Sequence, residues 1–193
     1  MAERFDAAYY RRFYGRQPVH DRRQIAHLGE GVLALAAWWR IPIRSVLDVG
    51  AGKGYWRSWL EEAHPNVKYH GIDASEYACR RYGHERADVA EWKPRRQYDL
   101  VVCQSLLQYV DDTDAATTID TLAMASRGLL LFDAPTASDR DTVIDPSRTD
   151  LDIRWRSGDW YRKRLRRGFM EIGGGMWASR ECPAVFYELE RAR

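Results

Sequence analysis

Five short apolar runs alternate with longer amphipathic segments between residues 45 and 135, and this alternation constrains the fold more than any other feature. The runs read SVLDVG (45–50), KYHGID (68–73), ERADV (85–89), YDLVVCQS (98–105) and GLLLFDAP (128–135). Near-continuous apolar strands separated by helices are typical of a parallel sheet that is covered on both faces. The pattern therefore predicts an α/β fold with a doubly wound, mostly parallel sheet.

The two flanks of this region read differently. Residues 5–39 have a helical pattern, which a proline then interrupts. Residues 157–168 also read as a helix, with Ser157 as its N-cap and Gly168 at the C′ position. Residues 169–190 read as two strands around a glycine-rich turn, and strands joined without a helix pair antiparallel. We therefore expect the sheet to end in an antiparallel hairpin.

The length of 193 residues suits one domain with a full core, so residues 1–193 are expected to form a single domain. Residues 1–40 would be a helical cap segment within it. Residues 136–157 make a long polar connection, and such connections often act as lids or binding loops.

Composition excludes several classes of protein. The formal net charge of +2 is too small to indicate a nucleic-acid partner by itself. The N-terminal stretch MAERFDAAYYRR has no apolar core, and no apolar run approaches ~18 residues, so neither a secretory signal nor a membrane partner is predicted. The cysteines Cys79, Cys103 and Cys182 are far apart and odd in number, which argues against disulfides and a zinc site. We expect a cytoplasmic protein.

The turn after the first apolar run carries the strongest functional signal. Gly50, Gly52 and Gly54 follow Asp48 at alternate positions, where backbone can approach a ligand and a helix N-terminus favours an anion. A dinucleotide fits poorly, because Tyr55 stands where its third glycine is needed and a carboxylate repels pyrophosphate. A zwitterion explains both details, since its carboxylate would take loop N–H groups while its ammonium would lie near Asp48.

At this point the sequence resembles the class I S-adenosylmethionine-dependent methyltransferases. Their first motif stands here as Asp48-Val-Gly50-Ala51-Gly52-Lys-Gly54. The resemblance extends from about Ser45 to Leu189 and implies a Rossmann-like sandwich with S-adenosylmethionine as cofactor. It also implies methyl transfer by in-line displacement to an O, N, S or C nucleophile, for which we expect a small-molecule acceptor.

The resemblance further implies cofactor contacts outside the glycine loop. These are Asp73 with Ala74 at the ribose hydroxyls, Asp88 and Val89 at the adenine, Gln104 and Ser105 on the methionine side, and Tyr10 closing over the cofactor from the N-terminal segment.

The catalytic residues are not identified by this resemblance. Many small-molecule members of the family have a histidine after the fourth strand, where this chain has Gln108. His20 and His27 in the N-terminal segment are the other candidates for a general base. The five histidines form no metal-like cluster. The acidic stretch 111–114 resembles the metal-binding acids of catechol-type enzymes, but we favour an N-cap cluster at the next helix.

Other functions remain open. Residues 154–167 contain seven cations and one acid, which fits either an RNA-binding patch or the solvated face of a helix whose buried stripe is Trp160, Tyr161, Leu165 and Phe169. We favour the solvated face, with an RNA methyltransferase as the alternative. A binding protein that kept the fold and lost the chemistry is an alternative of another class, and an NAD-dependent oxidoreductase fits worst.

Overall fold

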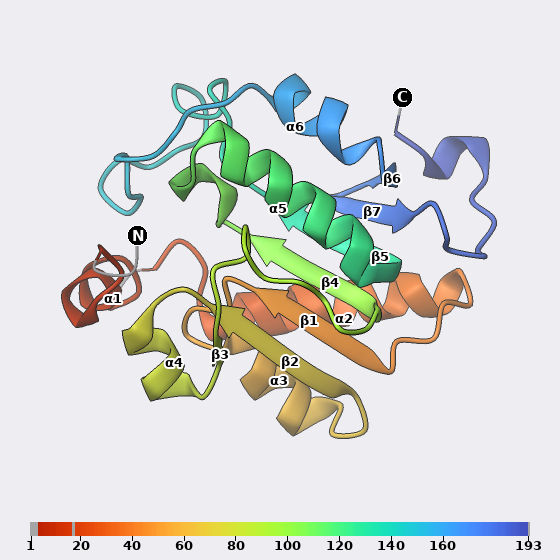
Figure 1. Cartoon of the computed structure of the whole chain (residues 1–193), viewed down its shortest axis with the longest axis horizontal. Helices are drawn as coiled ribbons and strands as arrows, with labels where there is room; N and C mark the ends of the chain where they lie inside the picture. The colour runs from red at the N-terminus through yellow and green to blue at the C-terminus, as the bar shows by residue number, and fades with distance from the viewer. Residues whose placement is uncertain (1–3, 17, 193) are drawn as a thin grey trace.

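The strands form one seven-stranded sheet in the order β3-β2-β1-β4-β5-β7-β6 (Figure 1). The computed structural model describes residues 4–16 and 18–192. The strands are β1 (Ser45–Val49), β2 (Lys68–Asp73), β3 (Glu85–Arg86), β4 (Tyr98–Gln104), β5 (Ser126–Asp133), β6 (Phe169–Gly173) and β7 (Met176–Ser179). The first five are parallel, whereas β7 pairs antiparallel with both β5 and β6. The predicted mostly parallel sheet with a C-terminal antiparallel hairpin is confirmed.

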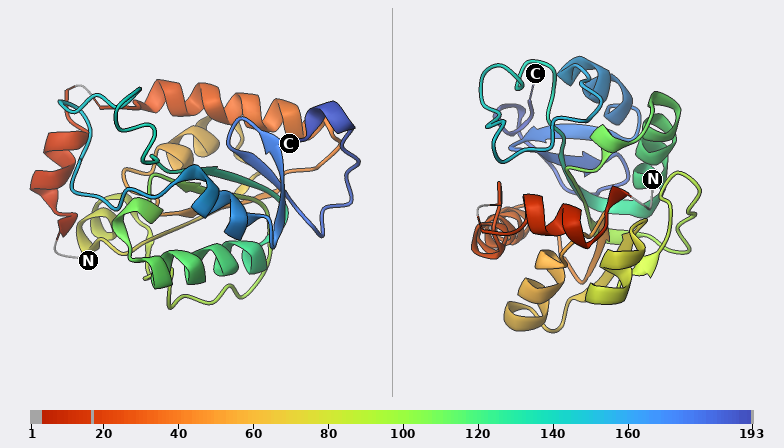
Figure 2. Two further views of the ribbon diagram at one scale, coloured as in Figure 1. Left: turned by 90° about the horizontal axis from the view of Figure 1, so that it is seen from above. Right: turned by 90° about the vertical axis from the view of Figure 1, so that its left-hand side faces the viewer.

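Helices cover the sheet on both faces, which explains why every residue of β1 is buried. They are α1 (Ala7–Phe13), α2 (Arg22–Trp38), α3 (Tyr55–Ala63), α4 (Glu76–Tyr82), α5 (Asp112–Ala125) and α6 (Gly158–Leu165), with short 3-10 helices η2 (Leu107–Tyr109) and η3 (Glu188–Glu190). In Figure 2, α2 and α5 lie on opposite sides of the sheet.

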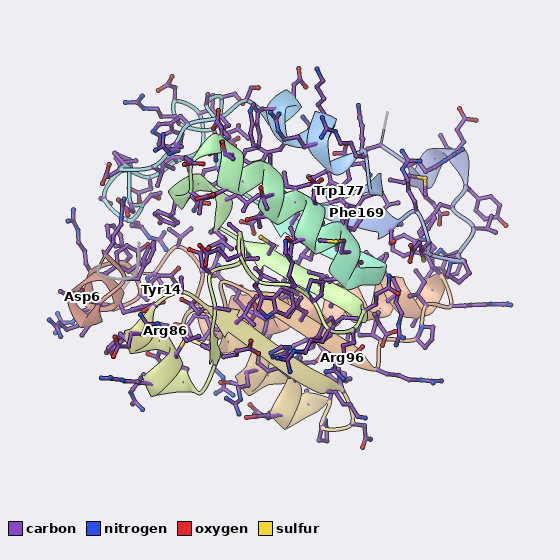
Figure 3. All side chains as sticks on the ribbon, in the orientation of Figure 1. Asp6, Tyr14, Arg86, Arg96, Phe169 and Trp177 are labelled. Carbon is purple, nitrogen blue, oxygen red and sulfur yellow. The ribbon has the colours of Figure 1, made fainter. Side chains whose placement is uncertain are left out.

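Two apolar clusters hold these layers together. One joins the sheet to α2 and α3. The other joins it to α5 and α6, and it contains Phe169 and Trp177 of the hairpin, both labelled in Figure 3. The carboxyl ends of β1, β2 and β4 all face α1 (Figure 1), so residues after these strands gather at one edge of the sheet.

Several predicted boundaries differ from the structure. The helical segment 5–39 is two helices, because Asp6 and Asp21 each cap a separate start. The strand predicted at 85–89 ends at Arg86, where the chain turns away from β2. β5 begins earlier than predicted, at Ser126, and the last strand ends at Ser179 rather than near residue 190.

The sixth helix confirms one predicted cap and corrects the other. Ser157 accepts a hydrogen bond from the Trp160 N–H, as an N-cap does. The helix ends at Leu165, however, and Gly168 lies beyond the C′ position without a positive φ. Its lack of a side chain serves packing instead, since a Cβ there would lie 2.6 Å from the Ala123 Cβ. Among the described residues, no helix combines the length and apolar character needed to cross a membrane.

Candidate functional site

The loop after β1 adopts a backbone that only glycine accommodates easily. Gly50, Gly52 and Gly54 have φ angles of 74°, 50° and 66°, all in the left-handed region. The Gly50 and Ala51 N–H groups donate to the Ile72 carbonyl at 2.9 and 3.1 Å, which ties the loop to the end of β2. Gly54 is the N-cap of α3 and provides no side-chain cap. The first N–H groups of α3 therefore point toward the loop and can bind an anion.

Asp73 at the end of β2 lies against this loop. Its Oδ2 accepts a hydrogen bond from the Gly52 N–H at 2.8 Å, and its Oδ1 accepts one from the Ser75 N–H at 2.7 Å. Burial raises the pKa of Asp73, and the two backbone hydrogen bonds oppose that rise. Ser75, not Asp73, is the N-cap of α4, because its hydroxyl accepts from the Ala78 N–H. Ala74 lies between them, partly exposed.

Asp48 is buried beneath the loop rather than in front of it. The Tyr69 hydroxyl donates to its Oδ2 at 2.8 Å. Burial raises the pKa of Asp48 to about 7, which the Tyr69 hydrogen bond opposes and the nearby Asp73 reinforces.

His84 also supports the glycine loop, and it was not among the site residues predicted from the sequence. Its Nε2 donates to the Gly52 carbonyl at 3.1 Å, since a carbonyl can only accept. Its Nδ1 is buried without a hydrogen-bond partner in the described part of the chain, and burial lowers the pKa of the ring. A Cβ on Gly71 would lie 2.5 Å from the Tyr69 hydroxyl and 2.7 Å from the His84 Nδ1. A glycine inside an apolar strand indicates that other groups pack closely against the backbone, so Gly71 was the available signal for this contact.

The residues expected at the adenine separate into two environments. Asp88 is exposed and its Oδ1 accepts a hydrogen bond from the Ala90 N–H at 3.1 Å. Val89 is buried in the core cluster that faces α5. The chain leaves β3 just before them, where the Ala87 N–H donates to the Asp73 carbonyl at 3.0 Å. Asp88 therefore follows directly on a residue that is hydrogen-bonded to Asp73.

Gln104 and Ser105 converge on an acid that sequence reasoning missed, Asp133 at the end of β5. Its Oδ1 accepts hydrogen bonds from the Ser105 N–H and hydroxyl, both at 2.9 Å, and its Oδ2 accepts from the Gln104 Nε2 at 2.7 Å. The Gln104 Oε1 accepts from the Trp56 indole at 2.8 Å. Ser105 has φ 51°, a strained conformation of the kind that collects at functional sites. The final acid of the fifth apolar run was the available signal.

The N-terminal segment closes over the glycine loop. Tyr10 is buried, and its hydroxyl lies 3.8 Å from where a Cβ on Gly52 would be. The Tyr14 carbonyl accepts from the Lys53 Nζ at 3.0 Å. Tyr14, labelled in Figure 3, lies at the edge of the sheet beside α1. The predicted closure of Tyr10 over this edge matches its position, while its contact with a cofactor stays a prediction.

The family is decided by comparison with known proteins. A family model described as a methyltransferase domain matches residues 19–174, most of the chain. The chain belongs to the methyltransferase family.

Two curated relatives and one solved structure illustrate the range of this methyltransferase family. The chain is 26% identical over 162 residues to trans-aconitate 2-methyltransferase of Methylobacterium radiotolerans, covering 78% of this chain and 58% of that protein. It is 28% identical over 96 residues to malonyl-[acyl-carrier protein] O-methyltransferase of Acetivibrio thermocellus, covering 45% of this chain and 34% of the relative. The chain thus spans about half the length of the curated relatives, or less.

The structural comparison agrees on the fold. N-methyltransferase NodS from Bradyrhizobium japonicum, solved in complex with S-adenosyl-L-homocysteine, aligns with a TM-score of 0.62 at 17% identity, covering 92% of this chain and 99% of that one. The resemblance to class I methyltransferases is confirmed at the level of family and fold.

A cavity opens beside the ends of β4 and β5. It measures about 350 Å³ and is lined by Tyr9, Tyr109, Ser105 and Asp133 among others. Of the three candidates for a general base, His20 and Gln108 both line it. His27 does not, because it lies on α2 and lines a separate cavity beside the hairpin turn.

Some of the seven cations of the segment 154–167 are engaged within the protein. Arg156 is buried, and its Nε donates to the Asp112 carboxylate at 2.8 Å. Arg164 stacks on the Trp160 ring with 3.6 Å between its Cζ and the ring centroid. Arg162 pairs with Glu171 at 3.3 Å. Arg156 is therefore not part of a basic surface, whereas most of the other cations of the segment are exposed.

The acidic stretch 111–114 caps α5, as favoured. The Asp111 carboxylate accepts from the Thr113 and Asp114 N–H groups, both at 2.9 Å. Of the buried stripe predicted for α6, Tyr161, Leu165 and Phe169 are buried, whereas Trp160 is half-exposed beneath its arginine.

Proposed function

We propose that this chain transfers a methyl group from S-adenosylmethionine to a small-molecule acceptor. One observation carries the proposal: Asp73 is held by backbone N–H groups beside three left-handed glycines, and no cation pairs with it among residues 4–16 and 18–192. An acid in this position has unused lone pairs that can accept two ribose hydroxyls.

The residues present suit the cofactor. Asp73 and Ala74 would hold the ribose, the Gly50–Gly54 loop and the start of α3 would hold the methionine carboxylate, and Asp48 would act from beneath the loop. The turn at Asp88 and Val89 would border the adenine. When bound, the cofactor supplies a methyl group on a positively charged sulfur, whose loss leaves a neutral thioether.

The work of the protein in such a reaction is positioning. Nucleophile, methyl carbon and sulfur must be collinear, and holding them so replaces a bimolecular encounter. Ser105 and Gln104 stand between the loop and the cavity, so they would border the reacting atoms. α1, with Tyr10 and Tyr14, covers the loop and would exclude water from it.

Several wider features belong to the same proposal. Residues 1–193 act as one methyltransferase domain, with residues 1–40 as its cap and 136–157 as a lid. The three free thiols, far apart in sequence, support a cytoplasmic location. The engaged arginines of the segment 154–167 favour a small molecule over RNA as acceptor.

The names of similar proteins support methyl transfer and leave the acceptor open. One relative is named for trans-aconitate and one structural neighbour is an N-methyltransferase crystallised with S-adenosyl-L-homocysteine. These names imply different kinds of acceptor, so they do not identify the acceptor of this chain.

Calorimetry tests the cofactor directly. We expect micromolar binding of S-adenosylmethionine and S-adenosylhomocysteine, and none of NAD. Asp73→Asn should weaken both by about tenfold to a hundredfold, since an amide N–H would face the loop donors. Asp120→Asn, an exposed acid on α5, is the matched control and should bind like wild type. Failure of the wild-type protein to bind either sulfur compound would overturn the proposal.

A further inference from the structure

We propose that the methyl acceptor is a primary or secondary amine on an apolar body, bound in the cavity beside β4 and β5. This inference rests on the proposed function and names its substrate class. β4 lies next to β1 in the sheet, and β5 follows it. A cofactor held at the ends of β1 and β2 therefore has this cavity as its neighbour on the β4 side.

The apolar part of the cavity is largely aromatic. Most of its rings and aliphatic groups come from three segments: α1 with its C-cap, the turn at η2 and the long connection after β5. They include Tyr9, Phe13, Tyr14, Tyr109, Val143 and Ile144. Aromatic faces stabilise a nearby cation, and the volume of about 350 Å³ is at the small end for ligand sites.

Carboxylates dominate the charge of the walls. Asp133 accepts only neutral donors, from Gln104 and Ser105, and no cation pairs with it in the described part of the chain. Asp139 likewise accepts from the Thr136 N–H and hydroxyl, at 2.8 and 2.7 Å. A carboxylate acceptor would meet like charge at both, whereas an ammonium group would meet its opposite.

The remaining charged groups do not reverse this balance. Asp150 is paired with Arg4 at 2.8 Å. Arg148 is the cation of the lining, and its guanidinium donates to the Pro18 carbonyl. His20 is the titratable base there. The lining thus holds three carboxylates and one arginine, and of the carboxylates only Asp150 pairs with an arginine among the described residues.

Gln108 provides an independent indication of the ligand. Gln108 is among the residues that line the cavity and is only 4% exposed, and its buried Oε1 has no hydrogen-bond partner among the described residues. A buried acceptor left unpaired is costly unless a ligand supplies the donor. Together with Asp133, it presents two acceptors to a group that carries N–H bonds. An amine nitrogen has such bonds, and a carboxylate has none.

The chemistry balances with S-adenosylmethionine as methyl donor. An ammonium first loses one proton to water. The nitrogen lone pair then forms a bond to the methyl carbon, while the carbon–sulfur bond breaks and its electron pair stays on sulfur. The positive charge passes from sulfur to the methylated nitrogen.

Matched probes of equal length test this class. Phenethylamine and 3-phenylpropanoate, with butylamine and pentanoate as an aliphatic pair, are titrated into the protein saturated with S-adenosylhomocysteine. Methyl transfer to each probe is followed with S-adenosylmethionine labelled in its methyl group. We expect at least one amine to bind about tenfold tighter than its matched acid and to be the one that is methylated.

Variants test which residues produce the preference for the amine over the acid. Asp133→Asn should bring the amine-to-acid ratio toward one, and Gln108→Met should weaken amine binding without strengthening the acid. Asp141→Asn, an exposed acid in the same connection, should keep the wild-type ratio. If the protein binds S-adenosylhomocysteine but binds only the acids, or none of the probes, the inference is overturned. If S-adenosylhomocysteine itself does not bind, the proposed function fails instead.

Discussion

Asp48 should make the protein less stable as pH rises toward neutrality, and Asp48→Asn should remove that loss. The carboxyl is buried under the glycine loop, with the Tyr69 hydroxyl as its hydrogen-bond donor. Burial raises its pKa from 3.8 to about 7. A carboxyl whose pKa is raised by folding holds its proton in the folded state after the unfolded chain has lost it. Its contribution to stability therefore decreases as pH rises from the pKa of the unfolded chain to that of the folded protein, and is constant at higher pH.

The magnitude follows from that rise. A rise of the pKa from 3.8 to about 7 corresponds to about 4 kcal/mol once both states are ionised. Between pH 5 and pH 8 the wild-type protein should lose about 2–3 kcal/mol of this, because part of the loss has already occurred by pH 5. Asparagine cannot ionise, so the variant should not show that part of the pH dependence. The extra amide N–H of asparagine can change the free energy of unfolding by a fixed amount, and that amount cancels when the difference between variant and wild type is compared at the two pH values.

The assay is urea unfolding of wild type and Asp48→Asn at pH 5 and pH 8, followed by tryptophan fluorescence. The variant should gain about 2–3 kcal/mol on wild type between the two pH values. Asp120→Asn, which removes an exposed carboxylate from α5, should give no such gain. An equal difference between wild type and Asp48→Asn at both pH values would refute the reasoning, because it would mean that Asp48 is ionised throughout.

Three further perturbations test other parts of the structure. Arg156→Met removes a buried guanidinium that holds Asp112 and two backbone carbonyls of the turn after β4, so it should lower the free energy of unfolding in urea by about 2–4 kcal/mol. Gly71→Ala places a Cβ 2.5 Å from the Tyr69 hydroxyl and should lower the thermal midpoint, by an amount matching about 1–3 kcal/mol. Gln108→Met, by contrast, removes a buried oxygen that has no partner, so it should raise the free energy of unfolding by about 1 kcal/mol. A lower thermal midpoint of this variant would mean that the oxygen is not left unpaired for a ligand, and would contradict the proposed ligand-binding role.

The order of strands and loops could be predicted because it depends on local pattern. The apolar run at 45–50 forms a fully buried strand and the run at 68–73 one whose second half is buried, as the pattern indicates, since helices cover both faces of the sheet. The glycine loop could be predicted for a related reason, as three glycines at alternate positions are needed only where the backbone takes left-handed angles. Boundaries were less accurate where one capping residue decides them, as Asp21 does for α2.

Contacts between distant segments could not be predicted in this way. The bond between Tyr69 and Asp48 depends on strand register, which places Asp48 beside Gly71. Arg156 belongs to a run of cations in the sequence, and only the packing of the long connection against η2 shows that it is buried. The cavity beside β4 and β5 likewise depends on residues a hundred positions apart, such as Tyr9 and Tyr109, whose hydroxyls are 2.8 Å from each other.

Four acids at or near the ends of parallel strands show why position alone does not define a role. Asp48, Asp73, Asp88 and Asp133 occupy similar places in the sequence pattern, yet their surroundings differ. The first is buried beneath a loop with a tyrosine, the second accepts two backbone N–H groups, the third is exposed, and the last is held by two side chains beside a cavity. The loop that follows each strand makes the difference, because it decides which donors reach the carboxylate and how much water remains. An acid supplied with backbone donors can still accept from a sugar, whereas one beside a largely apolar cavity and without a paired cation is better suited to a positively charged ligand. The two neighbouring sites inferred above follow from that distinction, and the amine site can fail while the cofactor site stands.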